Sequence, residues 1–172
     1  MFSNINTHIG VIYRNYNTKN HFKNLSLISR ACKKNKVPFF VANNLSMALK
    51  FRANGIYISA YNKLGLKHLC LNRNNFQVLG SAHNIKEINE KINQGCQIIF
   101  ISPLFKTKSY KKFLGILKFN LLTNCFKHNF YALGGINAGK IKKLRIINCL
   151  GFGGINFAQK KTGLKIRPVF NK

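Results

Sequence analysis

Short apolar runs recur along the chain and alternate with stretches that can form helices. Each run is rich in β-branched or aromatic residues, which is typical of buried strands. Seven such runs occupy residues 9–13, 37–41, 55–58, 76–80, 97–101, 130–133 and 151–155. The segments between them predict helices that include residues 25–35, 44–53, 85–94 and 140–148. Repeated strand and helix predicts a parallel sheet that is covered on both faces.

Polar residues and glycines follow directly after these predicted strands, which favours a closed barrel over an open, doubly wound sheet. In a barrel of parallel strands the functional groups lie just beyond the carboxyl end of each strand. The residues at those places are Arg14, Asn43, Asn44, Ser59, Ser81, His83, Ser102, Gly134, Gly135, Asn137 and Asn156. Only seven strand-helix units are visible, and 172 residues fall short of the roughly 200 that a full barrel uses. We therefore expect one domain over residues 1–172, an incomplete (β/α)8 barrel of the TIM type.

The chain has almost no acidic side chains. It contains no Asp, and its two acidic residues, Glu87 and Glu90, lie on one predicted helix. Paired carboxylates around a glycosidic bond, a metal held by aspartates and an Asp-oriented triad are therefore excluded, unless the two glutamates supply them.

The 29 Lys and Arg residues give a formal net charge of +27. Clustered cations indicate nucleic-acid binding, but here they are scattered, and Lys, Asn, Ile and Phe are enriched together, as expected from drift in an AT-rich genome. We therefore expect small phosphorylated ligands as partners and not nucleic acid. No apolar run is long enough to span a bilayer and residues 1–10 are polar, which predicts a cytoplasmic protein without membrane contact. Self-association is left open.

Two segments have the chemistry of anion binding. Gly134 and Gly135 end a predicted strand and precede a predicted helix, so backbone N–H groups and the helix dipole could hold a phosphate. The segment resembles a P-loop but has Ile141 where the metal-binding Ser or Thr would stand. The loop 102–112 follows another strand and is dense in hydroxyl and ammonium groups, which suit an oxyanion or diphosphate.

Five motifs in order resemble the thiamine phosphate synthase family and its related thiazole tautomerases. They lie at residues 80–87, 102–109, 114–115, 132–137 and 151–155, and the similarity extends over nearly the whole chain from about Ile9. The resemblance implies a (β/α)8 barrel that joins an aminopyrimidine diphosphate to a thiazole phosphate with Mg2+, giving thiamine phosphate and pyrophosphate. Diphosphate would leave first, and the thiazole nitrogen would then capture the pyrimidine methyl cation.

The resemblance also assigns site residues. Ser81 and Lys111 would be the catalytic residues, and Arg14, Asn43 and Ser81 would bind the diphosphate and pyrimidine. The thiazole phosphate would be held by a second group of residues. That group is Thr107, Ser109, Gly134, Gly135 and Phe157.

The chain departs from the family at several of these places. Both metal-binding Asp positions are amides here, Asn44 and Asn62, and the Gln and Lys that flank the family's Arg are Ile12 and Tyr16. Losing two carboxylates weakens a site for a hard cation. The alternatives are therefore a phosphate-binding relic without turnover, an isomerase of the tautomerase kind, and a basic nucleic-acid binder.

Two further points stay open in the sequence. His83 could serve as an acid or base, although we interpret it as structural. The family's first strand and helix have no counterpart in the chain, which would leave a gap in the barrel for a partner chain or residues 1–8 to fill.

Overall fold

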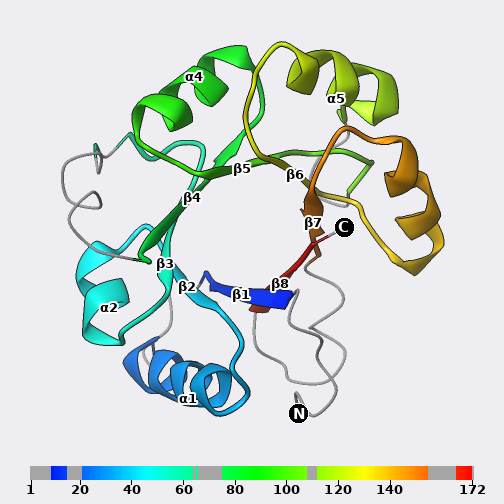
Figure 1. Cartoon of the computed structure of the whole chain (residues 1–172). Helices are drawn as coiled ribbons and strands as arrows, with labels where there is room; N and C mark the ends of the chain where they lie inside the picture. The colour runs from blue at the N-terminus through cyan, green and yellow to red at the C-terminus, as the bar shows by residue number, and fades with distance from the viewer. Residues whose placement is uncertain are drawn as a thin grey trace.

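The computed structural model describes residues 9–14, 21–63, 65, 75–107, 112–154 and 166–171, the last of these by their backbone alone. Eight strands close into one ring (Figure 1). They are β1 (Ile9–Tyr13), β2 (Phe39–Ala42), β3 (Gly55–Ile58), β4 (Gln77–Ala82), β5 (Ile98–Ile101), β6 (Phe130–Leu133), β7 (Gly151–Gly153) and β8 (Ile166–Asn171).

The first seven strands confirm the sheet expected from the sequence. Each pairs in parallel with the next, from β1 through β7. The eighth position is not a strand-helix unit, because β8 runs antiparallel to both β7 and β1. The protein is thus an α/β barrel of the TIM type with seven parallel strands. The expectation for the gap was wrong: it is filled by β8, near the end of the chain, and neither a partner chain nor residues 1–8 is needed to close the ring.

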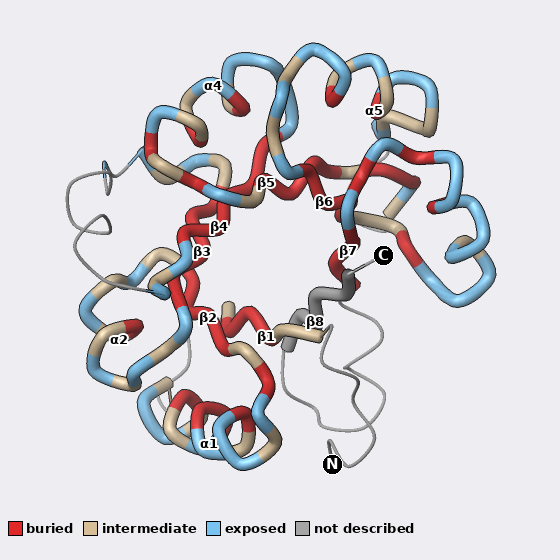
Figure 2. Tube along the Cα trace, viewed as in Figure 1, coloured by how far each residue is buried: buried red, intermediate tan, exposed pale blue. Residues whose placement is uncertain are grey.

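Helical segments cover the outside of the ring (Figures 1 and 2). They are α1 (His21–Lys34), α2 (Leu45–Lys50), α4 (Ile85–Asn93), α5 (Gly115–Asn124) and the 3-10 segment η1 (Ala138–Ile146). Three of the predicted helices are confirmed as α1, α2 and α4. The fourth predicted helix is present as η1, which winds as a 3-10 helix, and its N-cap residue, Asn137, makes no capping hydrogen bond through its side chain.

Asparagine caps determine where two helices begin. The Asn44 side chain accepts from the Met47 N–H at the start of α2, and the Asn84 side chain accepts from the Glu87 N–H at the start of α4. The Glu87 carboxylate reaches back to the His83 N–H at 2.7 Å. Both caps directly follow the carboxyl end of a strand, so they also fix how the chain leaves the ring.

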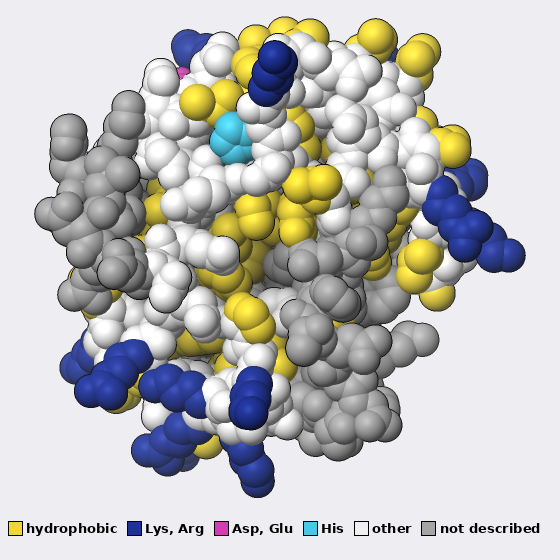
Figure 3. All heavy atoms as spheres, in the orientation of Figure 1, with side chains coloured by type: hydrophobic (Ala, Val, Ile, Leu, Met, Phe, Trp, Pro, Cys, Tyr) yellow, Lys and Arg dark blue, Asp and Glu magenta, His cyan; other side chains and the backbone are white. Residues whose placement is uncertain are grey.

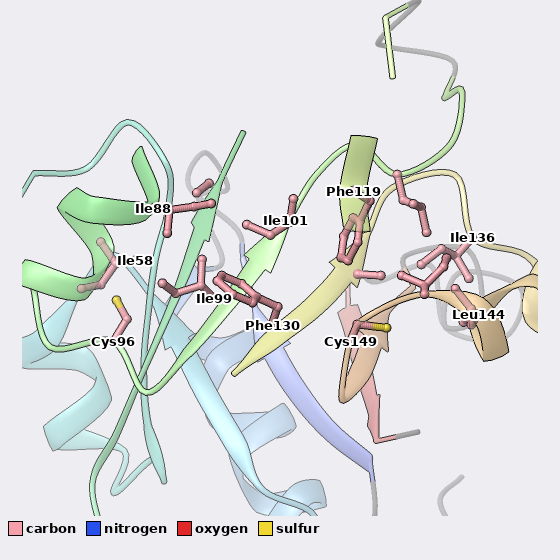
Figure 4. Close-up of a cluster of buried hydrophobic side chains, with 14 of the residues drawn as sticks. Ile58, Ile88, Cys96, Ile99, Ile101, Phe119, Phe130, Ile136, Leu144 and Cys149 are labelled. Carbon is pink, nitrogen blue, oxygen red and sulfur yellow. The ribbon is translucent and has the colours of Figure 1, made fainter. Parts of the chain in front are cut away.

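Apolar side chains pack on both surfaces of the ring. Inside it, eight side chains form a cluster that contains no helix residue: Ile12, Phe40, Ala42, Tyr57, Leu79, Phe100, Tyr131 and Leu133. Outside it, strand residues such as Ile99 and Ile101 pack against Ile88 of α4 and Phe119 of α5 (Figure 4). The strands are buried while the outer helix faces are exposed (Figure 2), as expected for a parallel sheet covered on both sides.

Candidate active site at the carboxyl ends of the strands

The parallel ring brings the predicted site residues to one end of the barrel. Arg14 follows β1, Asn43 follows β2 and Thr107 lies in the loop after β5. Gly134 directly follows β6. Because β1 to β7 all point the same way, these positions share a single rim.

Ser81 faces the inside of the ring. In β4 its neighbour Leu79 belongs to the interior cluster, whereas a Cβ on Gly80 would meet Cys96 and Lys91 on the outside. Side chains alternate along a strand, so Ser81 is on the same side as Leu79. It is 5% exposed. The strand thus holds the Ser81 hydroxyl at the mouth of the barrel, in a largely dry environment.

Three predicted site residues cannot be placed. Ser109, Lys111 and Phe157 lie outside the described residues, as does Tyr16. Their roles stay predictions.

The loop after β5 packs directly on the glycine turn after β6. The Leu104 N–H donates to the Leu133 carbonyl at 2.8 Å, and the Phe105 N–H donates to the Gly134 carbonyl at 3.1 Å. Gly134 and Gly135 have φ angles of 96° and 68°, in the region that favours glycine. A Cβ on Gly135 would lie 2.6 Å from the Phe105 carbonyl oxygen, so no side chain fits there. The predicted cradle is therefore a tight backbone turn closed by the neighbouring loop.

A lysine that we did not assign from the sequence lies beside this turn. The Lys140 Nζ is 3.3 Å from the Gly135 carbonyl oxygen and 4.9 Å from the centroid of the Phe105 ring. It brings a positive charge to the place where a phosphate would bind. The Gly-Lys pair at residues 139–140 was the available signal in the sequence.

His83 connects the ends of β4 and β5. Its Nδ1 lies 2.6 Å from the Ser102 carbonyl oxygen, which can only accept, so Nδ1 carries the proton in this contact. The Ser102 hydroxyl is 3.2 Å from the same nitrogen. These contacts fit the structural role that we expected for His83.

On the opposite side of the rim, Asn43 is the centre of an amide network. Its Nδ2 donates to the Ser59 Oγ and to the Tyr61 hydroxyl, both at 2.9 Å. Its Oδ1 accepts from the Ser59 N–H at 2.8 Å and from the Asn62 Nδ2 at 3.2 Å. Asn43 has a φ of 56°, which asparagine tolerates better than most residues. The network fixes the end of β2 against the loop after β3.

The two degenerate metal positions do not fit Mg2+. The Asn44 Oδ1 is used by the Met47 N–H at 3.0 Å and the Ser46 hydroxyl at 2.8 Å, so it serves as a helix cap. The Asn62 side chain donates to Asn43 through its Nδ2. Neither residue offers a carboxylate, and Mg2+ prefers charged oxygen ligands. Within the described part of the chain, no three His, Cys, Asp or Glu residues form a group that could hold a metal ion.

A buried lysine lies under the same loop. Lys91 of α4 is fully buried, and its Nζ donates to the Asn62 carbonyl at 2.7 Å and to the Gln94 Oε1 at 2.8 Å. Burial lowers the pKa of the Lys91 ammonium, and the charges of Cys96, Glu90 and Glu87 act in the opposite direction. Sequence reasoning missed this residue, although a lysine three positions after Ile88, on the apolar face of a predicted helix, was a usable signal.

Two clefts among the described residues lie away from this rim. One of about 370 Å3 is lined by residues that include Ala48 and Phe76, and one of about 280 Å3 by residues that include Cys32 and Pro38. Asn54, which lines both, directly precedes β3, at the amino ends of the strands. Neither cleft coincides with the predicted site.

One face of the molecule shows how the charge is distributed. Hydrophobic side chains fill the middle of the ring, whereas Lys and Arg side chains gather on the periphery, next to α1 and α2 and beside η1 (Figure 3). No helix among the described residues is long and apolar enough to cross a membrane.

Comparison with known proteins decides the family. The profile of the family described as "Thiamine monophosphate synthase" matches residues 8–157. The chain belongs to the thiamine monophosphate synthase family. This confirms the resemblance that the sequence motifs indicated.

Individual relatives agree with that family. A thiamine-phosphate synthase of Prochlorococcus marinus subsp. pastoris is 32% identical over 136 residues, which cover 77% of this chain and 38% of the relative. The thiamine-phosphate synthase of Fusobacterium nucleatum is 24% identical, over 80% of this chain and 68% of the relative. The chain thus spans less than two fifths of the length of the Prochlorococcus relative.

A solved structure supports the fold. The thiamine phosphate pyrophosphorylase of Pyrococcus furiosus superposes with a TM-score of 0.66 at 17% identity, over 82% of this chain and 68% of that chain. At this identity the likeness concerns the fold, in agreement with the seven parallel strands.

Proposed function

We propose that the protein carries out the thiamine phosphate synthase reaction of its family. It would join an aminopyrimidine diphosphate to a thiazole phosphate, releasing pyrophosphate. The C–O bond to the diphosphate breaks with its electron pair on the leaving group, and the lone pair of the thiazole nitrogen then forms the new C–N bond. Both substrates are small and phosphorylated, as expected for a chain of net charge +27.

The observation that carries this proposal is the joint position of Ser81 and the glycine turn. Ser81 faces the inside of the ring at the end of β4, and Gly134 and Gly135 lie at the same rim after β6. A phosphate held at the turn would orient the thiazole toward the mouth of the barrel. Holding both reactants in one place makes the bond-forming step effectively unimolecular, which lowers its barrier.

Each of the other predicted residues has a role in this proposal. Thr107 would contact the thiazole and diphosphate, and Arg14 would neutralise the leaving diphosphate. Asn43, whose amide is used within the rim, would support the pyrimidine end by fixing Ser59 and Tyr61 beside it. Ser109, Lys111 and Phe157 complete the proposal from the family resemblance. Lys140 is an addition from the geometry, because its ammonium lies next to Gly135.

One observation favours a second candidate, a phosphate-ligand site without turnover. Asn44 caps α2 and Asn62 binds Asn43, so the positions that hold a metal in the family are engaged within the protein. Where departure of the diphosphate depends on a metal ion, such a site would bind both substrates and leave them unchanged.

A turnover assay separates the two candidates. Purified protein in excess would be incubated with both substrates, with and without Mg2+, and thiamine phosphate would be quantified. The proposed reaction predicts product from the native protein and a loss of about 100-fold for Ser81→Ala, as is typical when one polar group at a reacting centre is removed. Binding of both substrates without any product would support the second candidate.

A further inference from the structure

Lys91 is the most unusual charged residue in the described part of the chain. Its side chain is fully buried between α4 and β4, and a Cβ on Gly80 would lie 3.0 Å from the Lys91 Cδ and 3.2 Å from its Cγ. The glycine in β4 therefore leaves the room in which the lysine stem lies. From there the side chain reaches the loop after β3, where Nζ contacts the Asn62 carbonyl.

The stability of the fold does not explain why a charged ammonium is buried at this position. Both hydrogen-bond acceptors of Nζ, the Asn62 carbonyl and the Gln94 Oε1, are neutral oxygens. The Glu87 carboxylate on the same helix accepts from the His83 N–H and from the Asn84 Nδ2. Glu90 and Glu87 act on the ammonium through their charge, but neither is buried and Nζ donates to neither. Burying a charge without a counter-charge in contact costs free energy, and an apolar residue of similar size usually serves a core equally well or better.

The place of the charge connects Lys91 to the site. Nζ is 2.7 Å from the carbonyl of Asn62, which stands at one of the two family metal positions and has an amide in place of the carboxylate. A positive charge so close to Asn62 opposes binding of a second cation there and attracts an anion. Through Asn62 it also supports the Asn43 network, because the Asn62 Nδ2 donates to the Asn43 Oδ1.

We propose that Lys91 is a positioning residue that fixes Asn62 through its backbone carbonyl and supplies the positive charge that a metal ion would bring. The site would then hold a diphosphate without a divalent cation. The inference rests on the proposed function, because it takes a diphosphate as the ligand of this rim. It adds that the loss of both carboxylates is matched by an internal cation.

Titration of the full chain with inorganic pyrophosphate tests the inference. Calorimetry at about 150 mM salt screens loose attraction to the surface charge, and the heat of Mg2+ binding to pyrophosphate is subtracted with a blank. The native protein should bind with nearly the same Kd in EDTA and in excess Mg2+, within about twofold. Lys91→Met should weaken binding in EDTA at least about tenfold, which corresponds to the loss of one well-placed charge.

Two further variants make the result specific. Lys86→Met removes a charge from the exposed face of the same helix and should change the Kd by less than about twofold. Lys91→Arg keeps the charge and should restore most of the affinity lost in Lys91→Met. Circular dichroism and the unfolding midpoint would establish that each variant is folded. If Lys91→Met does not fold, Asn62→Asp decides: the added negative charge should offset the nearby Lys91 charge and weaken pyrophosphate binding, without a gain from Mg2+.

Three outcomes would overturn the inference. They are pyrophosphate binding that tightens about tenfold or more with Mg2+, unchanged binding by Lys91→Met, and a Mg2+-dependent gain in Asn62→Asp. The first of these leaves the proposed function intact and removes only the role of Lys91. Absence of pyrophosphate binding in both conditions would remove the proposed function as well.

Discussion

The two sides of the barrel rim are held together by different groups, the backbone on one side and amide side chains on the other. On the β5–β6 side, the loop after β5 and the turn at Gly134 and Gly135 are joined by backbone hydrogen bonds, and glycine is required by shape. On the β2–β3 side, Asn43 and Asn62 are joined through their side chains. A turn whose N–H groups come from the backbone keeps them whatever the composition, whereas a metal site made of aspartates is lost in a chain with no Asp.

The largest expected effect is on the backbone side, in Gly135→Ala. The new Cβ would lie 2.6 Å from the Phe105 carbonyl oxygen, at a φ of 68°. We expect a loss of about 3 kcal/mol in the free energy of unfolding, from backbone strain and overpacking together, and a loss of phosphate binding. Urea unfolding and a titration with thiamine phosphate measure the two effects.

Gly115→Ala is the matched control for that variant. Gly115 has a φ of 70°, but a Cβ there would meet nothing within 4 Å. It should cost about 1 kcal/mol and leave ligand binding unchanged. Equal effects of the two substitutions would mean that the contact between loop and turn has no part in the site.

The next effect belongs to the middle of the rim, in Ser81→Ala. Because Ser81 faces the inside of the ring, we expect kcat to fall about 100-fold, with less than about 1 kcal/mol lost in stability. The control is Ser29→Ala, since Ser29 is also buried but donates to the Phe51 carbonyl, away from the rim. Steady-state kinetics of both variants decide the matter, and an equal fall in kcat would contradict a specific role for Ser81.

On the β2–β3 side of the rim, we expect a substitution to lower the free energy of unfolding. Asn43→Ala removes four hydrogen bonds of the network and places alanine at a φ of 56°. We expect the free energy of unfolding to fall by about 2 kcal/mol. Asn148→Ala removes hydrogen bonds from an exposed side chain to Thr123 and Asn124, away from the rim, and should cost less than about 1 kcal/mol. Chemical denaturation that gives similar values for both would show that the network does not hold the rim together.

The smallest effect is expected for His83→Ala. Since the His83 Nδ1 is directed to the Ser102 carbonyl, we expect kcat to change by less than about threefold. A fall of about 100-fold, together with a changed pH profile of kcat, would instead assign His83 to proton transfer. That result would favour the isomerase alternative.

The polar residues at the ends of the strands could be predicted from the sequence, but the closure of the ring by β8 could not. The seven runs and the polar residues behind them placed Ser81, Asn43 and the glycine turn at one rim, because parallel strands share their carboxyl end. The strand β8 was missed, since it contains Pro168 and is defined by pairing with two edges far away in the chain. The helix α5 was missed because it lacks a side-chain cap, and Leu117 and Leu121 are exposed, so its apolar residues do not mark one buried face.

The electrostatic part of the site was the least predictable. The substitutions at Asn44 and Asn62 could be noticed through the family resemblance, and an asparagine at the start of a predicted helix is a usual cap. Nothing local in the sequence indicated that Lys91 reaches the carbonyl of Asn62. The contact between Lys91 and Asn62 depends on how α4 packs on β4, which brings together residues that are far apart in the sequence.

We infer that this rim holds the ligands of thiamine phosphate synthesis. The most direct test of this inference is a calorimetric titration of the native chain with thiamine phosphate, alone and with pyrophosphate present, at about 150 mM salt and in EDTA. We expect saturable binding of one thiamine phosphate per chain under these conditions, and loss of that binding in Gly135→Ala but not in Gly115→Ala. Absence of saturable binding, or equal binding by both glycine variants, would contradict it.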